Sequence, residues 1–266
     1  MPIGAIVHRL ETVPSTNDAA RALALQGAAH GTAVLAGEQT RGRGTKGRVW
    51  HSPAGLGLYS SFILRGPGGG ALPFPHLIPL AAGLAASDAV FETSGVACGL
   101  KWPNDILCAE PGDTYPRYMS PDRKLGGILA EGVSGGTGGD FAVVGIGLNV
   151  GHGPGDFPED IRAASTSIRL AGGRTVTIET LWAALCWALD GWYNVLTRGD
   201  KEKVVRTFES RPAFPQGAAV RIETAEGTFE AEYRGLDAEG RLVVARAGAG
   251  AGTAALAAVL KLERIS

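Results

Sequence analysis

Glycine interrupts the apolar segments of this sequence throughout its length, with 40 glycines among 266 residues. That share is about twice the average for proteins, and it lacks the G-X-Y period of a collagen-like chain. Glycines between or inside apolar runs serve turns, or places where the backbone must approach another group closely. A chain of this length allows one large domain, or one large domain and one small one.

Charge and cysteine content exclude several classes of protein. Lys and Arg number 25 and Asp and Glu number 26, which excludes a uniformly basic nucleic-acid binder as a description of the whole chain. The three cysteines show no C-x-x-C spacing, so we expect free thiols rather than a disulfide framework or a zinc site. The N-terminus lacks a signal-peptide pattern, and no apolar run approaches the ~20 residues of a membrane helix. We therefore expect a cytoplasmic protein without a membrane partner.

The order of apolar and polar residues predicts strands and helices that are mixed without regular β-α-β alternation. Ser15 to Asp18 has the S-x-x-D form of a helix capping box. The predicted helices cover 19–25, 76–92, 178–198 and 200–210. The predicted strands cover 3–10, 32–38, 58–64, 96–101, 106–108, 125–131 and 141–150. This pattern favours an α+β fold with a mixed or largely antiparallel sheet.

The pattern of predicted elements changes after about residue 212. Short strand-like segments with Gly and Asp between them follow, at 220–222, 228–234, 241–245 and 259–265. Such a series is typical of a small β-barrel-like module. We expect a domain boundary there, with one domain at 1–212 and a second at 213–266.

A basic, glycine-rich loop runs from Arg41 to Arg48 and is followed by Val49 and Trp50. Successive glycine N–H groups can form a concave nest, and the cationic side chains add charge-assisted donors, which together suit a phosphate or a carboxylate. The loop is not a Walker A motif. A solvated basic loop explains the segment equally well when it is taken alone, and an RNA-binding loop is less favoured because no aromatic array accompanies it.

Two further segments combine turns, glycines and polar groups. Lys101-Trp102-Pro103-Asn104-Asp105 reads as a rigid turn between two strands, and its indole favours packing over an exposed hairpin. The Gly126–Gly127 pair inside a predicted strand indicates close approach of a ligand or another backbone. Lys124, at the entrance to that strand, is either an ammonium over the same space or a solubilising strand end.

A fourth segment, Val143 to Val150, reads as a buried strand that contains two glycines and ends near Asn149. A buried amide needs hydrogen-bond partners, which either the backbone or a ligand supplies.

The order of these segments resembles that of the biotin–protein ligases. The segments are S-T-N, E-Q-T-R-G-R-G-x-x-G-R-x-W, K-W-P-N-D, R-K-L-G-G-I-L-x-E and G-I-G-L-N-V, and the likeness runs from about Leu10 to the end of the chain. The resemblance implies a class II synthetase-like catalytic domain followed by an SH3-like barrel. It also implies the short form of the family, without N-terminal DNA-binding helices and without a nucleic-acid partner.

The resemblance also implies a reaction. The biotin carboxylate attacks the α-phosphate of ATP, which gives biotinyl-5′-AMP and pyrophosphate, and a lysine of a biotin carboxyl carrier protein then attacks the mixed anhydride. No enzyme nucleophile is needed, in keeping with the lack of a G-x-S-x-G motif. Biotin and ATP are thus the expected substrates. Mg²⁺ is expected to arrive with ATP, so we expect no metal site built by the protein.

By match to the family's motifs, the resemblance assigns a role to each site residue. The expected biotin-binding residues are Ser15, Thr16, Asn17, Gln39, Arg43, Gly44, Thr45 and Lys124. The expected nucleotide-binding residues are Arg43, Lys46, Arg48, Trp50, Lys101, Asn104 and Asn149. The expected catalytic residues are Lys124, Arg43 and Asp105, with Asp105 near the incoming amine.

The sequence departs from the family's pattern at two places. Thr45 stands where the family usually has Arg or Lys. We expect Lys46, one residue along, to supply the missing charge; the alternative is a loop that releases some biotinyl-AMP. The segment between Leu107 and Arg123 is longer than in many relatives and is expected to form a surface insertion.

Three other functions fit parts of the sequence. They are a lipoate or octanoyl ligase, a biotin-sensing transcription factor and a non-catalytic nucleotide-binding module. The combined motifs and the C-terminal module favour biotin over lipoate, and the neutral charge argues against DNA binding. The sequence leaves the oligomeric state open, a homodimer included.

Overall fold

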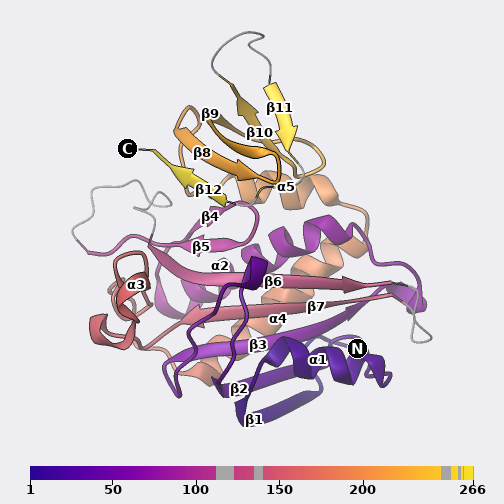
Figure 1. Cartoon of the computed structure of the whole chain (residues 1–266). Coiled ribbons are helices and arrows are strands. Elements are labelled where there is room, and N and C mark those ends of the chain that lie inside the picture. The colour runs from indigo at the N-terminus through magenta and orange to yellow at the C-terminus, as the bar shows by residue number, and fades with distance from the viewer. Residues whose placement is uncertain (112–122, 135–139, 247–252, 257–258, 260, 266) are drawn as a thin grey trace.

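The computed structural model describes residues 1–111, 123–134, 140–246, 253–256, 259 and 261–265 (Figure 1). Most of the expected surface insertion, residues 112–122, lies outside the described residues. None of the helices in the described ranges is long and apolar enough to cross a membrane.

A seven-stranded sheet forms the larger part of the fold. Its strand order is β1-β2-β3-β7-β6-β5-β4, in which β1 runs parallel to β2 and every other pair is antiparallel. The strands are β1 (Val7–Val13), β2 (Ala33–Gln39), β3 (Gly57–Arg65), β4 (Gly99–Lys101), β5 (Asp105–Leu107), β6 (Lys124–Val133) and β7 (Phe141–Asn149). The expected mixed sheet is confirmed, although its first strand begins at Val7 rather than residue 3.

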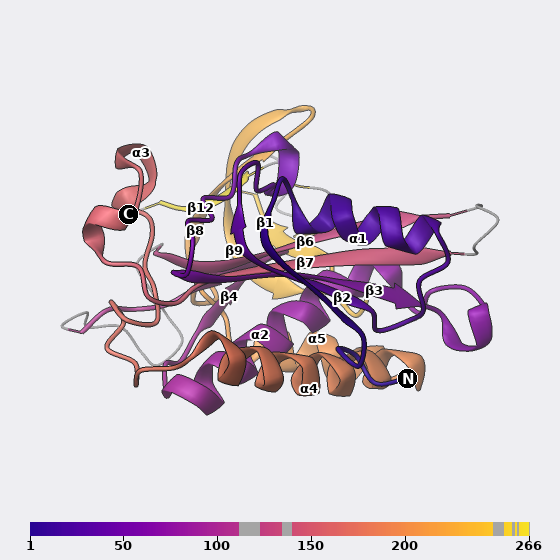
Figure 2. The ribbon, with the colours of Figure 1, turned by 90° about the horizontal axis from the view of Figure 1, so that it is seen from below.

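Helices cover the two faces of this sheet unequally (Figure 2). The long helices α2 (Ile78–Ser94) and α4 (Ile178–Thr197) pack together on one face, with α5 (Lys201–Glu209) beside them. The short helix α1 (Thr16–Leu25) lies on the other face, against β2, β3 and β7. A further one-turn helix, α3 (Glu159–Arg162), had no signal in the sequence. Because α2 packs against both the sheet and α4, its alanine-rich surface is buried on nearly all sides.

The alternation of β3 divides the core into two clusters. Phe62 and Leu64 belong to the main cluster beneath α2 and α4, whereas Ile63 joins the smaller cluster that includes Ala20 and Ala24 of α1. Strand side chains point to alternate faces, so Ser61 shares a face with Ile63. The α1 face therefore combines a small apolar cluster with polar and glycine positions, and it carries the candidate site.

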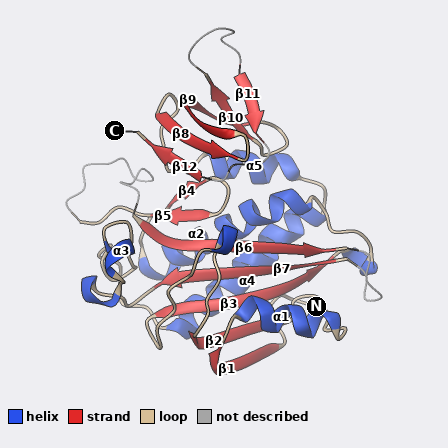
Figure 3. Ribbon diagram, viewed as in Figure 1, coloured by secondary structure: helices blue, strands red, loops and turns tan. Residues whose placement is uncertain are grey.

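A second, five-stranded antiparallel sheet follows the helices (Figure 3). Its order is β11-β10-β9-β8-β12, with β8 (Ala219–Thr224), β9 (Gly227–Leu236), β10 (Leu242–Ala245), β11 (Thr253–Leu256) and β12 (Lys261–Arg264). The predicted α+β class with a second small β unit is confirmed; β11 was not anticipated. Buried side chains of both sheets belong to one continuous core, so the domain boundary at residue 212 stays a prediction.

The β4–β5 turn joins the two sheets. The indole of Trp102 is only 7% exposed, and its Nε1 donates a hydrogen bond to the carbonyl oxygen of Gly240 at 2.9 Å. Leu100 in β4 also exchanges backbone hydrogen bonds with Arg211 and Ala213, at 2.7 and 3.1 Å. The expectation that this turn packs against other structure is confirmed, and its partner is the second sheet.

Candidate active site

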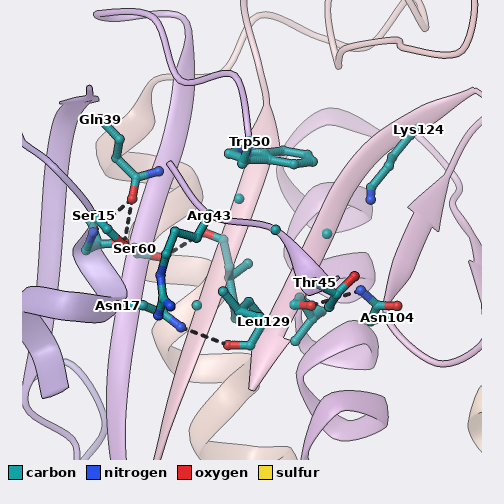
Figure 4. Close-up of a pocket in the computed structure, with 17 residues that line it drawn as sticks. Ser15, Asn17, Gln39, Arg43, Thr45, Trp50, Ser60, Asn104, Lys124 and Leu129 are labelled. Atoms are coloured by element: carbon teal, nitrogen blue, oxygen red, sulfur yellow. Dashed lines mark hydrogen bonds between the residues drawn. The ribbon is translucent and has the colours of Figure 1, made fainter. Parts of the chain in front are cut away.

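A cavity opens where the first turn of α1 meets the basic loop and the glycine-bearing strands β6 and β7 (Figure 4). About 440 Å³ of its space is free of protein atoms, part of it open to solvent. The lining residues are Ser15, Thr16, Asn17, Gln39, Arg43, Gly44, Thr45, Trp50, Ser60, Asn104, Lys124, Gly127, Ile128, Leu129, Gly145, Ile146 and Gly147. All eight residues expected to bind biotin are therefore brought together.

Glycines form the floor of this first cavity. Gly127 of β6 lies directly opposite Gly147 of β7, and Gly145 is two residues away on the same face. A Cβ atom on Gly147 would come within 2.5 Å of Trp50 Nε1, and one on Gly145 within 2.2 Å of Asn17 Oδ1. Close approach therefore explains Gly145 and Gly147, and the groups that approach them are side chains of the site rather than the ligand or second backbone expected at Gly126–Gly127.

Gln39 connects the start of α1 to the far end of the basic loop. Its Oε1 accepts hydrogen bonds from the Thr16 backbone N–H at 2.8 Å and from the Thr16 hydroxyl at 3.1 Å. Its Nε2 donates to Ser52 Oγ at 2.9 Å, and Ser52 Oγ donates to the carbonyl oxygen of Trp50 at 3.0 Å.

The predicted capping box is wrong, because Ser15 occupies the N-cap but its side chain makes no capping hydrogen bond.

Asn17 is buried beside the cavity floor, with 3% of its surface exposed. Its Oδ1 accepts a hydrogen bond from Ser61 Oγ at 2.6 Å. Its Nδ2 donates to the carbonyl oxygen of Leu129 at 3.2 Å and to Glu131 Oε2 at 2.9 Å. The amide is thus fixed in orientation by three protein partners, as a buried polar group requires.

Arg43 extends from the basic loop across the opening of the cavity. Its Nη2 lies 2.5 Å from Glu131 Oε2 and 3.1 Å from Asp18 Oδ1. The two carboxylates come from β6 and from the first turn of α1, so the loop is anchored to both elements. Neither carboxylate was assigned a role from the sequence.

Lys124 stands at the start of β6, beside Asp105 and Trp50. Its Nζ lies 2.6 Å from Asp105 Oδ1 and 5.3 Å from the centre of the Trp50 ring. Trp50 Nε1 is buried and has no hydrogen-bond partner within the described part of the chain. Asn104 lies in the β4–β5 turn and holds that turn against β6, because its Nδ2 donates a hydrogen bond to the carbonyl oxygen of Ile128 at 3.1 Å.

A second cavity adjoins the first and shares Gly44, Thr45, Trp50 and Lys124 with it. About 820 Å³ of its space is free of protein atoms, part of it open to solvent. Its remaining lining residues are Arg48, Val49, His51, Asn149, Phe157, Ile161, Ala164 and Ser165. The buried Asn149 has backbone partners, since its Nδ2 donates to the carbonyl oxygens of Thr166 at 2.9 Å and Lys124 at 3.4 Å.

Two of the expected nucleotide-binding residues line neither cavity. Lys46 has a left-handed backbone, with φ of 59°, and its Nζ donates to the carbonyl oxygen of Val259 at 2.5 Å. Burial, and secondarily the charge of Arg48, lower its pKa. Lys101 Nζ instead lies 5.5 Å from the centre of the Phe214 ring.

A different cation, Arg48, contacts the Thr45 side chain. Arg48 Nη2 donates to Thr45 Oγ1 at 3.1 Å, and Arg48 lines the second cavity.

Several residues that line the two cavities had no role assigned from the sequence. In the first cavity these are Ser60, Ile128, Leu129, Gly145, Ile146 and Gly147. Alternation along the glycine-bearing strands could have suggested Leu129, Gly145 and Gly147, because residues two apart share a face, whereas Ile128 and Ile146 fall on the opposite face. In the second cavity, Phe157, Ile161, Ala164 and Ser165 belong to a segment that carried no functional signal. No three His, Cys, Asp or Glu side chains gather as metal ligands within the described ranges.

Residues 10–149 match the model of the biotin/lipoate A/B protein ligase family. The match covers more than half of the chain and includes both cavities' strands and the basic loop. The chain belongs to the biotin/lipoate A/B protein ligase family.

Among relatives in this ligase family, a biotin–[acetyl-CoA-carboxylase] ligase from Paracoccus denitrificans is 32% identical over 247 residues, covering 88% of this chain and 92% of the relative. The bifunctional ligase/repressor BirA of Bacillus subtilis is 32% identical over 234 residues, covering 88% of this chain and 67% of the relative. The relatives that the chain matches are thus biotin–protein ligases.

Solved structures of the ligase family share the fold. The biotin protein ligase from Aquifex aeolicus in complex with biotin and ATP superposes with a TM-score of 0.77 at 26% identity, covering 98% of this chain and all of that chain. The Leishmania major enzyme in complex with biotinyl-5-AMP gives 0.61 at 26% identity, covering 98% of this chain and 99% of the other.

Proposed function

We propose that this ligase activates biotin with ATP to form biotinyl-5′-AMP and then transfers biotin to a lysine of a biotin carboxyl carrier protein. The observation that carries the proposal is the junction between the two cavities. Lys124 and Trp50 line both, so an acid in the first cavity and a nucleotide in the second would meet beside one ammonium group. A reaction that joins a carboxylate to a phosphate needs such positive charge at the point of contact.

The first cavity suits the biotin head group and its chain. A neutral ureido ring needs both donors and acceptors, and Ser15, Thr16, Asn17 and Gln39 offer both kinds of group. The glycine floor would lie along the acyl chain. Arg43 and Gly44 would meet the carboxylate end, where the basic loop crosses the opening.

In the adenylation step, an oxygen of the biotin carboxylate forms a bond to the α-phosphorus of ATP. The bond from that phosphorus to the bridging oxygen breaks, and pyrophosphate leaves. Lys124 would neutralise the charge that gathers on the phosphoryl oxygens. In the second cavity Arg48, Trp50 and Asn149 would border the nucleotide. Mg²⁺ would enter with the triphosphate, held by phosphates and water rather than by a protein cage.

In the transfer step, the neutral amine of the carrier lysine attacks the biotinyl carbonyl, and AMP leaves from it. Asp105, next to Lys124, is the carboxylate available to take the proton that the amine loses. Closing the basic loop over the anhydride until the carrier arrives would exclude water from it.

The deciding experiment incubates the protein with ATP, labelled biotin and a carrier domain. We expect label on the carrier lysine and formation of one pyrophosphate per turnover. Parallel reactions with lipoate and octanoate test the alternative substrates of the family. Incorporation of lipoate in preference to biotin would reject the proposal, and so would nucleotide binding without any acyl transfer.

A further inference from the structure

The carboxylate of Glu131 is where three parts of the site meet. A single oxygen, Oε2, accepts hydrogen bonds from Asn17 Nδ2 at 2.9 Å and from Arg43 Nη2 at 2.5 Å. Glu131 lies in β6, Asn17 in the first turn of α1 and Arg43 in the basic loop. Glu131 does not itself line either cavity.

We propose that Glu131 is a positioning residue for biotin ligation, which holds Arg43 across the first cavity and couples that position to Asn17. The inference rests on the proposed function, because it assigns to Glu131 the retention of biotin and its adenylate. Glu131 acts through Arg43 and needs no contact with substrate.

The basic loop requires such an anchor. Glycines at 42, 44 and 47 give its backbone wide freedom, and an unpaired Arg43 would lose conformational entropy whenever it crossed the cavity. A fixed carboxylate stabilises the crossing position before any ligand arrives. The hydrogen bond is charge-assisted, and such bonds are about twice as strong as neutral ones.

Glu131 is better placed for this task than Asp18, the other carboxylate at Arg43. The side chain of Glu131 is 27% exposed and that of Asp18 is 57% exposed. Water screens the more exposed pair more strongly. The Glu131 oxygen is also closer to Arg43 and is itself held by the buried Asn17 amide.

The other end of the loop is fastened to the same turn of α1 by a different route. Ser52 receives a hydrogen bond from Gln39, which accepts two from Thr16. Each fastening also involves a residue that lines the first cavity, Asn17 through Glu131 at one end and Gln39 at the other. Removing the charge of Glu131 would release the Arg43 end and leave the Gln39 end in place.

The test is Glu131→Gln in the full chain. The amide can still accept a hydrogen bond from Asn17 but carries no charge for Arg43. We expect KM for biotin to rise about tenfold and biotinyl-AMP to dissociate about tenfold faster, the effect of roughly halving one charge-assisted bond. At saturating biotin, kcat should change less than about threefold, because Lys124 and the junction are untouched.

A double-mutant cycle with Arg43→Gln tests whether Glu131 acts through Arg43. The double variant should resemble Arg43→Gln alone. Glu230→Gln is the matched control, since Glu230 is also a strand glutamate paired with an arginine, Arg221, at 3.0 Å. It should leave KM and adenylate release unchanged.

Two results would overturn the inference: unchanged KM and release in Glu131→Gln, or fully additive effects in the cycle. A loss of kcat and melting temperature with KM unchanged would also overturn it, because that pattern marks a purely structural role. Wild-type protein that fails to biotinylate a carrier would instead reject the proposed function, so the two failures are distinguishable.

Discussion

Lys124 Nζ and Asp105 Oδ1 lie 2.6 Å apart at the junction of the two cavities, so the ammonium meets a carboxylate before any substrate is bound. The pair sets a carboxylate, which itself lines neither cavity, beside an ammonium that lines both. Both side chains are partly buried, 28% and 17% exposed, which makes their attraction stronger than that of a surface pair.

Replacing Lys124 should damage the adenylation step. We expect Lys124→Ala to lower adenylate formation by roughly 10²–10³-fold, the usual cost of losing a preorganised charge-stabilising donor. Pyrophosphate release in the absence of carrier measures this step. Lys203→Ala, which removes an exposed lysine of α5, is the control and should match wild type. Normal pyrophosphate release from Lys124→Ala would remove Lys124 from the mechanism.

Methyl groups added to the floor glycines should affect the two substrates differently. Gly145→Ala would press on Asn17 and should raise KM for biotin about tenfold, whereas Gly147→Ala would push Trp50 aside and should mainly raise KM for ATP. Gly132→Ala lies in β6 with nothing within 4 Å and should change neither value. Steady-state kinetics, with biotin and ATP varied in turn, gives both KM values for each variant. If Gly132→Ala raised KM as much as Gly145→Ala or Gly147→Ala, the close-approach explanation would be contradicted.

Thr45 and its neighbours should set how long the adenylate stays bound. Thr45→Arg restores a cation beside the shared wall of the cavities and should slow biotinyl-AMP release several-fold. Arg48→Met should speed release, because Arg48 lines the second cavity. Lys46→Met should have a smaller effect, since Lys46 is bonded to Val259. The release rate of biotinyl-AMP from each of the three variants is measured by chase with unlabelled adenylate. If Lys46→Met had the largest effect, Lys46 would be the residue that supplies the charge missing at Thr45, as the sequence predicts.

The Trp102–Gly240 hydrogen bond should contribute to global stability. Trp102→Phe removes the donor and leaves a carbonyl oxygen without its partner, which should lower the free energy of unfolding by about 1–3 kcal/mol. Urea denaturation measures the change. Trp187→Phe alters an indole of α4 that is 76% exposed and should cost much less. Similar losses for both variants would argue against a special role for the bond between the sheets.

Stability should fall as the pH drops from about 6.5 toward 4, in part because of His152. Burial, and secondarily the charge of His51, lower the pKa of His152 to about 4. Between pH 4 and the ordinary pKa of ~6.5, His152 is protonated in the unfolded chain but neutral in the folded chain. Lowering the pH through this range therefore favours unfolding. The share of His152 is at most roughly 3 kcal/mol.

His152→Gln provides the check on this pH dependence. The difference in unfolding free energy between wild type and His152→Gln should shrink as the pH is lowered from 7 to 4.5. A difference that stays constant with pH would mean that His152 does not contribute.

The sequence predicted those features that depend on local chemistry. The strands around Gly126–Gly127 and Gly145 were recognisable from their apolar runs, and the glycine pair indicated close approach because glycine weakens a strand without another reason for its presence. The turn at Trp102 was recognisable because a buried indole needs a packing partner. The resemblance also grouped eight residues as expected biotin ligands, and all eight line one cavity.

Other features depend on packing between distant segments. A motif places Lys46 and Lys101 near the site along the chain but does not determine the direction of a flexible side chain, and both turn toward Val259 and Phe214 instead. The role proposed for Glu131 depends on the packing of β6 beside α1, which no local motif predicts. The wall at Phe157 likewise comes from a segment with no motif of its own.

The glycine floor also limits how the specificity of this enzyme can change. Where Gly127, Gly145 and Gly147 line the cavity there is no side chain left to remove, so any substitution at these three positions makes the space smaller. Acceptance of bulkier acids must therefore arise from the walls, for example at Leu129, which shares the face of Gly127 and still has side-chain atoms to lose. Substitutions at the three floor glycines can therefore only narrow the range of acids that fit the cavity.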